Sequence, residues 1–187
     1  MRLTLASGSP RRRELLGLLG VPFDVVAPDV DESVRATEDP ATYVERVARS
    51  KALAVTGRDV VLAADTTVVI DDTILGKPAD ASDAVAVLRR LSGRTHEVFT
   101  AVAVACNGRV NAAVERTLVT MGELPEADIA WYVGTGEPLD RAGSYAIQGA
   151  GAAFVTRVEG SVSNVIGLPL TLVIELLRSV GLDPFAS

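Results

Sequence analysis

The chain has 187 residues, of which 48% are hydrophobic and 22% are charged, and its formal net charge is -6. This composition is typical of a globular domain, so it excludes disorder and fibrous repeats. The acidic balance argues against nucleic acid as a main partner, because binding to a phosphate backbone requires a basic surface.

We expect a single domain over residues 1–187, since no linker, repeat or low-complexity segment interrupts the chain. The only cysteine, Cys106, cannot form an internal disulfide, which fits a reducing compartment. Every apolar run is broken by charge or glycine before it reaches membrane-spanning length, and the N-terminal run is too short for a signal peptide. These features predict a soluble, cytoplasmic protein without a membrane partner.

The first part of the chain predicts a short strand and two helices. Residues 2–6 alternate like a strand, and Pro10 then stands where the first residue of a helix is expected. That helix is expected to end near Gly20. A second helix is indicated by Asp39 as its N-cap and Pro40 as its first residue.

The middle of the chain predicts strands around one helix. Residues 60–70 form a β-branched run that is typical of a strand buried on both faces. Residues 80–91 have helical spacing, and residues 98–105 read as a long strand. The Asn-Gly pair at 107–108 is a strong hairpin signal and leads into a partner strand that ends near Met121.

The last part predicts a short helix from Pro125, a glycine-rich stretch over residues 134–151, a strand through Phe154 and Val155, and a closing helix from about Pro169. Strands and helices are mixed, and one hairpin is antiparallel. The sequence therefore predicts an α/β or α+β fold with a mixed sheet.

Three arginines occupy an unusual place in the first predicted helix. Arg11, Arg12 and Arg13 stand in its first turn, where free backbone N–H groups and the helix dipole already make the end positive. A bound anion would resolve this conflict, since N–H groups, serine hydroxyls and guanidinium groups all favour phosphate. The alternative is a solvated basic patch paired with carboxylates such as Glu14.

Lys51 lies on the apolar stripe of the second helix, four residues after Val47 and four before Val55. A lysine on a core-facing stripe must reach water, an anion or a carboxylate. It is therefore a candidate phosphate ligand. The alternative is that its side chain extends along the apolar surface to water.

Asp65 interrupts the β-branched run of residues 60–70. A carboxylate in a buried strand is costly unless it meets a cation or reaches a site. Such an aspartate could bind Mg²⁺ or hold a water molecule for attack. A structural ion pair is the competing interpretation.

Two further segments carry weaker signals. Lys77 lies in a turn before Pro78 and could hold phosphate as a point charge, although a lysine in a loop is usually solvated. Asp31 and Glu32 follow a break in the pattern, and paired carboxylates suit a hard cation, although acidic loops are common.

No serine or cysteine is paired with a histidine as an activated nucleophile, and His96 is expected to be a hydrogen-bonded strand residue. A phosphate-binding Gly-Lys-Ser/Thr motif and a spaced Gly-x-Gly-x-x-Gly after a strand are both absent from the sequence. The cations and carboxylates instead favour phosphate chemistry with water as the nucleophile, in which a carboxylate takes the proton of the water.

Seven segments, spread over nearly the whole chain, match the motifs of one known family in their order. They are Leu-Ala-Ser-Gly-Ser-Pro-Arg-Arg at 5–12, Ala-Asp-Thr at 64–66, Leu-Gly-Lys-Pro at 75–78, Leu-Ser-Gly-Arg-Thr-His at 91–96, Glu-Pro-Leu-Asp at 137–140, Ile-Gln-Gly at 147–149 and Ile-Gly-Leu-Pro at 166–169. In these segments the chain resembles the Maf septum-formation proteins.

This resemblance implies a fold related to the inosine triphosphate pyrophosphatases, with a mixed sheet flanked by helices and a cleft between two lobes. It implies hydrolysis of a nucleoside triphosphate between the α and β phosphates, with Mg²⁺ or Mn²⁺ as cofactor, and a homodimer. The segment around Gln148 resembles the branch that acts on dTTP and UTP, rather than the branch that acts on 7-methyl-GTP. A glutamine amide offers both a donor and an acceptor to a pyrimidine edge.

The resemblance also implies roles for individual residues. Asp65 resembles the catalytic base of the family, and Glu32 with Asp65 resembles its metal-binding carboxylates. The residues that resemble its phosphate-binding set are Ser7, Arg11, Arg12, Lys51 and Lys77. The residues that resemble its substrate-selecting set are Arg11, Thr66 and Gln148.

Two alternative functions stay open. A nucleotide-binding regulator of cell division or septum formation would use the same cationic residues without needing turnover. An inosine triphosphate house-cleaning enzyme would differ in base preference alone and would select purines.

Overall fold

The computed structural model describes residues 1–186 and consists of a mixed sheet with helices. The elements in chain order are β1 (Leu3–Ala6), α1 (Pro10–Gly17), β2 (Phe23–Val26), α2 (Pro40–Ala54), β3 (Val60–Ile70), β4 (Thr73–Leu75), α3 (Ala81–Leu91), β5 (Thr95–Cys106), β6 (Arg109–Met121), α4 (Glu126–Gly134), the 3-10 helices η1 (Glu137–Asp140), η2 (Ala142–Ser144) and η3 (Ala150–Phe154), then β7 (Val155–Glu159), α5 (Val162–Ile166) and α6 (Leu170–Ser179). The strands follow the order β2-β1-β3-β5-β6-β7, and β4 pairs with β3. The predicted mixed α/β class is confirmed.

The chain divides into two compact units. The first comprises residues 1–66, 100–115 and those from 167 on, and the second comprises residues 67–99 and 116–166. Strands β3, β5 and β6 each contribute residues to both units. The single domain over residues 1–187 and the cleft between two lobes stay predictions, and residue 187 lies outside the described residues.

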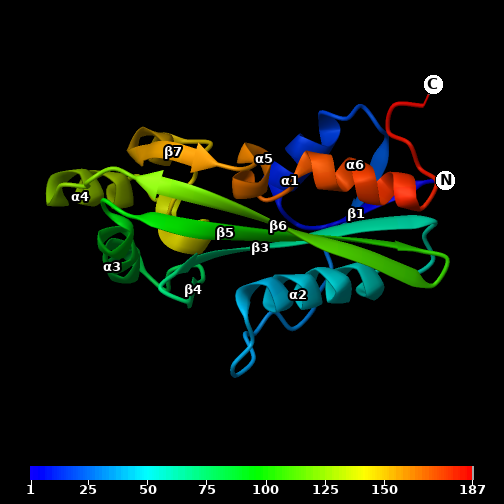
Figure 1. Ribbon diagram of the computed structural model, residues 1–187, viewed down its shortest axis with the longest axis horizontal. Helices are drawn as coiled ribbons and strands as arrows, with labels where there is room; N and C mark the ends of the chain where they lie inside the picture. Colours follow the sequence, from blue (N-terminus) through cyan, green and yellow to red (C-terminus); the bar gives the residue numbers. More distant parts are fainter. Residues whose placement is uncertain (187) are drawn as a thin grey trace. The chain divides into compact units, whose positions relative to one another are not determined.

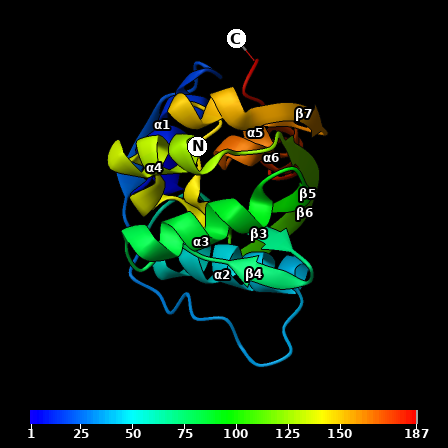
Figure 2. The same ribbon diagram turned by 90° about the vertical axis from the view of Figure 1, so that its left-hand side faces the viewer.

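The first unit is built on parallel strands. β1 pairs in parallel with β2 on one side and with β3 on the other, and its last residue, Ala6, lies opposite Ala63. In Figures 1 and 2, α2 lies on one face of these strands, and α1 and α6 lie on the other. Helix α2 faces the strands with Val44, Val47 and Ala48, which have no exposed surface. Burial of this apolar stripe stabilises the helix against the sheet.

The second unit is built on antiparallel strands. β4 returns along β3 through a two-residue turn at Asp71 and Asp72, both of which have positive φ angles. β6 pairs with β7, and α3 contacts α4 and η2 (Figure 1). The core of this unit includes three aromatic rings, those of Tyr132, Tyr145 and Phe154.

Local signals predicted most boundaries well. The strand at 60–70 is confirmed, and the Asn-Gly pair at 107–108 forms the predicted hairpin with both residues at positive φ. Asp39 caps α2 by accepting from the backbone N–H groups of Ala41 and Thr42. Helix α1 ends at Gly17, earlier than the predicted end near Gly20, because the next residues form tighter turns with hydrogen bonds that span three residues.

Six short elements were not predicted as regular structure, namely β2, β4, α5 and the three 3-10 helices. Each is short, so its pattern is too brief to show a period. Among residues 1–186, no helix is both long enough and apolar enough to cross a membrane.

Candidate functional site

The candidate site is centred on Asp65, in the middle of β3 in the first unit. The strand has apolar neighbours on both faces, and Asp65 itself is 5% exposed. The parallel pairing places the end of β1 beside the part of β3 that leads to Asp65. The turn with the arginines therefore begins close to this carboxylate.

Lys51 joins the two predicted carboxylates. Its Nζ lies 2.8 Å from Asp65 Oδ1 and 2.9 Å from Glu32 Oε2. The Lys51 side chain is 9% exposed, so the alternative interpretation, in which it extends to water, is wrong. Helix α2 holds the lysine on its buried stripe and directs the ammonium group toward β3. A charged lysine is tolerated in this position because two carboxylates compensate it.

The second carboxylate oxygen of Asp65 is left without a protein partner. Asp65 Oδ2 is buried and accepts no hydrogen bond from any of the described residues. Buried polar atoms are normally satisfied, so an unpaired carboxylate oxygen needs an explanation. The structural ion pair weighed from the sequence accounts for Oδ1 and leaves Oδ2 available for a water molecule or an ion.

Burial raises the pKa of Asp65 above its ordinary value, although the charges of Lys51 and Arg12 oppose the shift. The Lys51 hydrogen bond also lowers the pKa, and the negative charge of Glu32 raises it. The net effect is a raised pKa, so Asp65 is a stronger base than a solvated aspartate. A carboxylate with a raised pKa is a better proton acceptor than a solvated one.

The loop that carries Glu32 is fastened to α2. The hydroxyl of Tyr43 donates to the backbone carbonyl of Glu32 over 3.0 Å, and Arg46 donates to the carbonyl of Ser33 over 2.9 Å. Arg46 also forms an ion pair with Glu38 at 2.6 Å. The Glu32 side chain itself is 52% exposed. It therefore reaches Lys51 from the solvent side, on a loop with a fixed backbone.

Arg12 turns inward from the first turn of α1. Its Nε donates to the carbonyl of Gly167 over 2.8 Å, and one terminal nitrogen donates to Thr66 Oγ1 over 3.0 Å. Thr66 Oγ1 in turn lies 2.9 Å from the hydroxyl oxygen of Thr100. Burial lowers the pKa of Arg12, while the charges of Asp65 and Glu32 oppose this. These contacts hold a guanidinium group next to the Asp65 carboxylate.

Gly167 is suited to this contact by its backbone. Its φ angle is +123°, a conformation that residues with a side chain rarely adopt, and an added Cβ would lie 3.4 Å from Thr66 Oγ1. The sequence Ile-Gly-Leu-Pro at 166–169 therefore supplies a carbonyl for Arg12 at a place where no side chain fits easily.

The remaining residues of the predicted phosphate set in the first unit lie in the turn before α1. Ser7 is 5% exposed and its Oγ accepts from the backbone N–H of Ser9 over 3.2 Å. Ser9 is the N-cap of α1, and no acidic residue occupies the first turn, which carries Arg11. The conflict between these cations and the helix dipole is thus present in the folded protein.

Lys77 and Gln148 belong to the second unit, and their roles toward Asp65 stay predictions. Lys77 Nζ lies 2.5 Å from Asp140 Oδ1, and both side chains are exposed. Gln148 is exposed, in a segment between η2 and η3. Both side chains are therefore accessible to a ligand.

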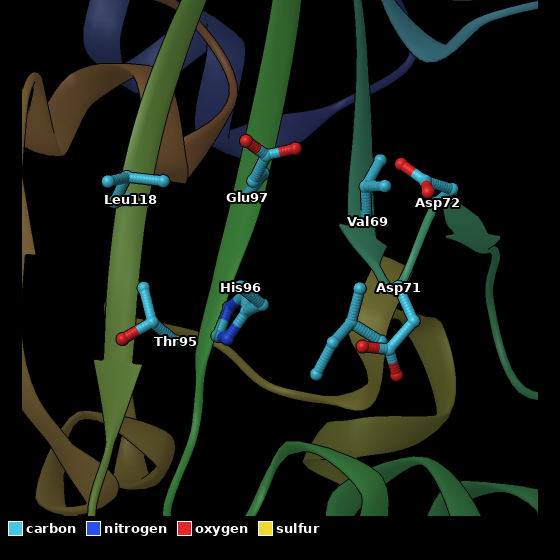
Figure 3. Close-up of a pocket in the computed structure, with 8 residues that line it drawn as sticks. Val69, Asp71, Asp72, Thr95, His96, Glu97 and Leu118 are labelled. Carbon is cyan, nitrogen blue, oxygen red and sulfur yellow. The ribbon is translucent and has the colours of Figure 1, made fainter.

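His96 is the hydrogen-bonded strand residue that the sequence predicts. It is 1% exposed on β5, and its Nε2 lies 2.8 Å from the hydroxyl oxygen of Tyr145. Burial lowers the pKa of His96 to about 4, so the ring is neutral near pH 7. It lines a pocket formed by β3, β5, β6 and the turn at Asp71 and Asp72 (Figure 3). Two carboxylates of that pocket, those of Asp71 and Glu97, are paired with arginines.

Three contributors to the site were missed in the sequence, namely Tyr43, Arg46 and Thr100, and Gly167 was identified only as part of the motif at 166–169, without a role. Tyr43 and Arg46 lie three residues apart on α2, which places them on one side of the helix. That spacing could have indicated an anchoring pair. The contacts of Thr100 and Gly167 join residues far apart in the chain, and no local pattern encodes them.

The donor set fits a divalent ion that arrives with its substrate. Two carboxylates, those of Asp65 and Glu32, converge on Lys51, and one Asp65 oxygen is unpaired among the described residues. Residues 1–186 contain no cluster of three or more His, Cys, Asp or Glu side chains that would hold an ion by themselves. Mg²⁺ is commonly held by one or two carboxylates together with substrate phosphates, and these residues match that pattern.

A family model described as "Maf-like protein" matches residues 2–180 of the chain. The chain is 58% identical over 184 residues to the dTTP/UTP pyrophosphatase of Anaeromyxobacter dehalogenans (strain 2CP-C), covering 96% of this chain and 94% of the relative. It is 53% identical to that of Myxococcus xanthus, covering 96% and 93%. It is 51% identical to that of Vibrio cholerae serotype O1, covering 95% and 97%.

A solved structure of the Staphylococcus aureus Ham1 protein is similar over 65% of this chain and 72% of that one, with 11% identity and a TM-score of 0.46.

Proposed function

The chain belongs to the Maf family, and from this premise we propose that it is a nucleoside triphosphate pyrophosphatase acting on dTTP and UTP. The products are the nucleoside monophosphate and pyrophosphate. The curated relatives that match nearly its whole length bear the name dTTP/UTP pyrophosphatase. Pyrophosphate release distinguishes this enzyme from a regulator that only binds nucleotide.

The observation that carries the proposal is the state of Asp65. A carboxylate with one oxygen held by Lys51, the other buried and unpaired, and a raised pKa is suited to act as a general base. Burial of a carboxylate oxygen without a partner lowers the stability of the fold, which is unfavourable unless the oxygen has a function. We assign Asp65 the proton of the attacking water, accepted at Oδ2.

The cations hold the triphosphate. Ser7, Arg11, Arg12 and Lys51 supply hydroxyl, guanidinium and ammonium donors in the first unit, and Lys77 supplies a further ammonium in the second. Guanidinium groups suit phosphate because they donate two parallel hydrogen bonds. Charge that builds up on the phosphoryl oxygens is thereby stabilised in the transition state.

The reaction is a displacement by water at the α phosphorus. A water oxygen forms a bond to that atom as Asp65 takes one of its protons, and the bond from the α phosphorus to the bridging oxygen of the β phosphate breaks. The electron pair of that bond leaves with pyrophosphate. The residues contribute by positioning the water molecule and by neutralising the negative charge of the leaving group.

A divalent cation, Mg²⁺ or Mn²⁺, completes the proposal, with Asp65 and Glu32 as its protein ligands. When bound, it would neutralise phosphate charge and lower the pKa of a coordinated water. Glu32 is held in reach of the site by the backbone contacts that Tyr43 and Arg46 make to its loop.

Base selection is assigned to Arg11, Thr66 and Gln148. The Gln148 amide can donate to one edge atom of a pyrimidine and accept from another. A cytoplasmic location, which the sequence features predict, and a homodimer, which the family resemblance implies, are part of the same proposal.

A substrate screen tests the proposal. Purified protein is incubated with dTTP, UTP, CTP, ITP or 7-methyl-GTP in the presence of Mg²⁺ or Mn²⁺, and the products are identified by ³¹P NMR. We expect monophosphate and pyrophosphate, formed fastest from dTTP and UTP. Binding without turnover would instead support the regulator, and a preference for ITP would support the purine house-cleaning enzyme.

A further inference from the structure

The segment that carries Gln148 has almost no regular structure to hold it in place. Residues 145–149 lie between η2 and η3, outside any helix or strand. Gln148 is exposed, so its side chain is not held by packing. A side chain that reads a base must be held in a defined geometry. Contacts to the backbone on either side of Gln148 therefore decide where its amide points.

Glu137 supplies contacts on the C-terminal side of Gln148. Its Oε2 accepts from the backbone N–H of Ala150 over 3.0 Å, and its Oε1 accepts from that of Gly151 over 3.1 Å. Both bonds are charge-assisted, which makes them stronger than bonds between neutral groups. One carboxylate thus fixes the two residues that begin η3.

Tyr132 supplies the contact on the N-terminal side. Its hydroxyl accepts from the backbone N–H of Ala146 over 3.1 Å and donates to Glu137 Oε1 over 2.6 Å. The Tyr132 ring has no exposed surface and packs edge-on against Phe154, with ring centroids 5.2 Å apart. The hydroxyl is therefore held rigidly, and it joins the two sides of the Gln148 segment through Glu137.

The glycines of the segment fit this pair closely. A Cβ added at Gly149 would overlap the Glu137 carboxylate, and one added at Gly151 would lie 2.5 Å from the Tyr132 hydroxyl and 2.8 Å from the carbonyl oxygen of Ala146. The backbone thus approaches both side chains as closely as it can. A side chain at Gly149 would displace the Glu137 carboxylate, and one at Gly151 would displace the Tyr132 hydroxyl or the backbone at Ala146, so glycine suits both positions.

The charge state of Glu137 matches its role. Burial alone would raise its pKa, but the hydrogen bonds from the Tyr132 hydroxyl and from the N–H groups of Gly151 and Ala150 outweigh burial and lower the pKa. Glu137 is therefore an anion at neutral pH and accepts all three bonds at once.

We infer that Tyr132 and Glu137 are positioning residues for base selection. Their side chains form hydrogen bonds to the backbone of Ala146, two residues before Gln148, and of Ala150 and Gly151, two and three residues after it. These bonds set the direction of the Gln148 amide. The inference rests on the proposed function, in which Gln148 reads the pyrimidine. Neither residue touches the reacting atoms, so their loss should alter base preference and KM more than kcat.

The test is a double-mutant cycle on the ratio of kcat/KM for dTTP to that for ITP. In Glu137→Gln, the amide nitrogen faces the N–H of Ala150 and cannot accept from it. We expect this variant to lower the ratio about fivefold to tenfold, which lies within the range for losing one net hydrogen bond. In a Gln148→Ala background the same change should alter the ratio less than about twofold, because the group it positions is gone.

Glu126→Gln is the matched control, since Glu126 forms an exposed ion pair with Arg89 in the same unit. Its ratio should equal that of the wild type. Tyr132→Phe keeps the buried ring and removes the hydroxyl, and Gly149→Ala displaces the Glu137 carboxylate. Both should lower the ratio in the same direction as Glu137→Gln, so the test does not depend on one variant. Circular dichroism establishes which variants are folded.

Two failures are distinguishable. If the wild type hydrolyses neither dTTP nor UTP, the proposed function is refuted, and so is the inference that rests on it. If the wild type selects dTTP, and folded Glu137→Gln and Tyr132→Phe keep that selectivity, the inference alone is overturned. It is also overturned if the effects of Glu137→Gln and Gln148→Ala multiply in the double variant, because Glu137 would then act independently of Gln148.

Discussion

Lys51 Nζ and Asp65 Oδ1 lie 2.8 Å apart, with both side chains less than 10% exposed. The pair joins the stripe of α2 to the middle of β3, and it leaves Asp65 Oδ2 buried without a partner among the described residues. A pair that served stability alone would be a poor choice, because apolar residues of the same size are often equally stable. The pair is better explained if the remaining oxygen, Asp65 Oδ2, takes part in a reaction.

Asp65→Asn tests the base directly. Asparagine keeps the shape of the side chain, and its oxygen can still accept from Lys51 Nζ, so we expect the variant to fold. Its amide cannot take a proton from water, and kcat should fall by about 10²–10⁴-fold. The measurement is steady-state pyrophosphate release from dTTP. The control is Asp29→Asn, which changes an exposed aspartate in the same unit. Full activity in Asp65→Asn would refute the assigned role.

The pH dependence of kcat/KM follows from the raised pKa of Asp65. The base is active when it is deprotonated, so the rate should rise with pH as Asp65 loses its proton. The midpoint of this rise should lie above the value of about 4 for a solvated aspartate. The profile is measured with the metal complex of dTTP at low free metal, so that kcat/KM reports Asp65 in the enzyme without a bound ion. A midpoint at or below the ordinary aspartate value would contradict the role of burial.

Lys51→Met separates charge from packing. Methionine fills the buried stripe much as the lysine stem does, so the helix should keep its place. Without the ammonium group the pKa of Asp65 should rise further, because the Lys51 charge lowers it. We expect the acidic limb of the kcat/KM profile to move to higher pH and kcat/KM for dTTP to fall at least about tenfold, the effect of losing a charged hydrogen bond.

Lys51→Ala is the companion variant, in which the stem is lost as well. It should lower turnover similarly and stay folded, since alanine suits the helix better than lysine does. Unfolding of both variants would identify Lys51 as a structural residue, and the phosphate-binding role would be lost.

The Glu38–Arg46 pair, which fastens the Glu32 loop, predicts a dependence of stability on pH. The Arg46 hydrogen bond, supported by the backbone N–H of Arg35, lowers the pKa of Glu38 from 4.5 to about 2. A lowered carboxylate pKa stabilises the fold at pH values above the unfolded pKa, and this stabilisation is lost as the pH falls toward the folded pKa. Between pH 4.5 and 2, the Tm of Glu38→Gln should therefore fall less steeply than that of the wild type.

Calorimetry across this pH range provides the measurement. The matched control is Glu45→Gln, because Glu45 forms a half-exposed pair with Arg49 one turn along the same helix. The control should follow the wild-type acid dependence. Parallel curves for Glu38→Gln and the wild type would show that the pair does not hold the loop.

The elements that were predicted well carry their signal within a few residues. The β-branched run at 60–70, the Asn-Gly pair at 107–108 and the Asp-Pro start of α2 each fix a boundary through local chemistry. Strand β2 and helix α5 have only four and five residues, and their conformation depends on pairing and packing with distant segments. Tertiary contacts decide such elements, and a sequence window does not contain them.

The same distinction holds within the site. Lys51 and Asp65 could be identified in the sequence because each is a charged residue in an apolar pattern. Their ion pair could not be predicted, and neither could the bond from Arg12 to Gly167, which spans 155 positions. Tyr132 is not marked by any pattern in the sequence, and Glu137 is marked only as part of the motif at 137–140, without a role.

The most direct test of the central claim is hydrolysis of dTTP in H₂¹⁸O by wild type and Asp65→Asn, with mass spectrometry of the products. Attack of water at the α phosphorus, with Asp65 as base, predicts that ¹⁸O enters the nucleoside monophosphate, that pyrophosphate is unlabelled, and that both products nearly vanish in Asp65→Asn. Label in pyrophosphate, release of inorganic phosphate with a nucleoside diphosphate, or undiminished turnover by the variant would contradict the account.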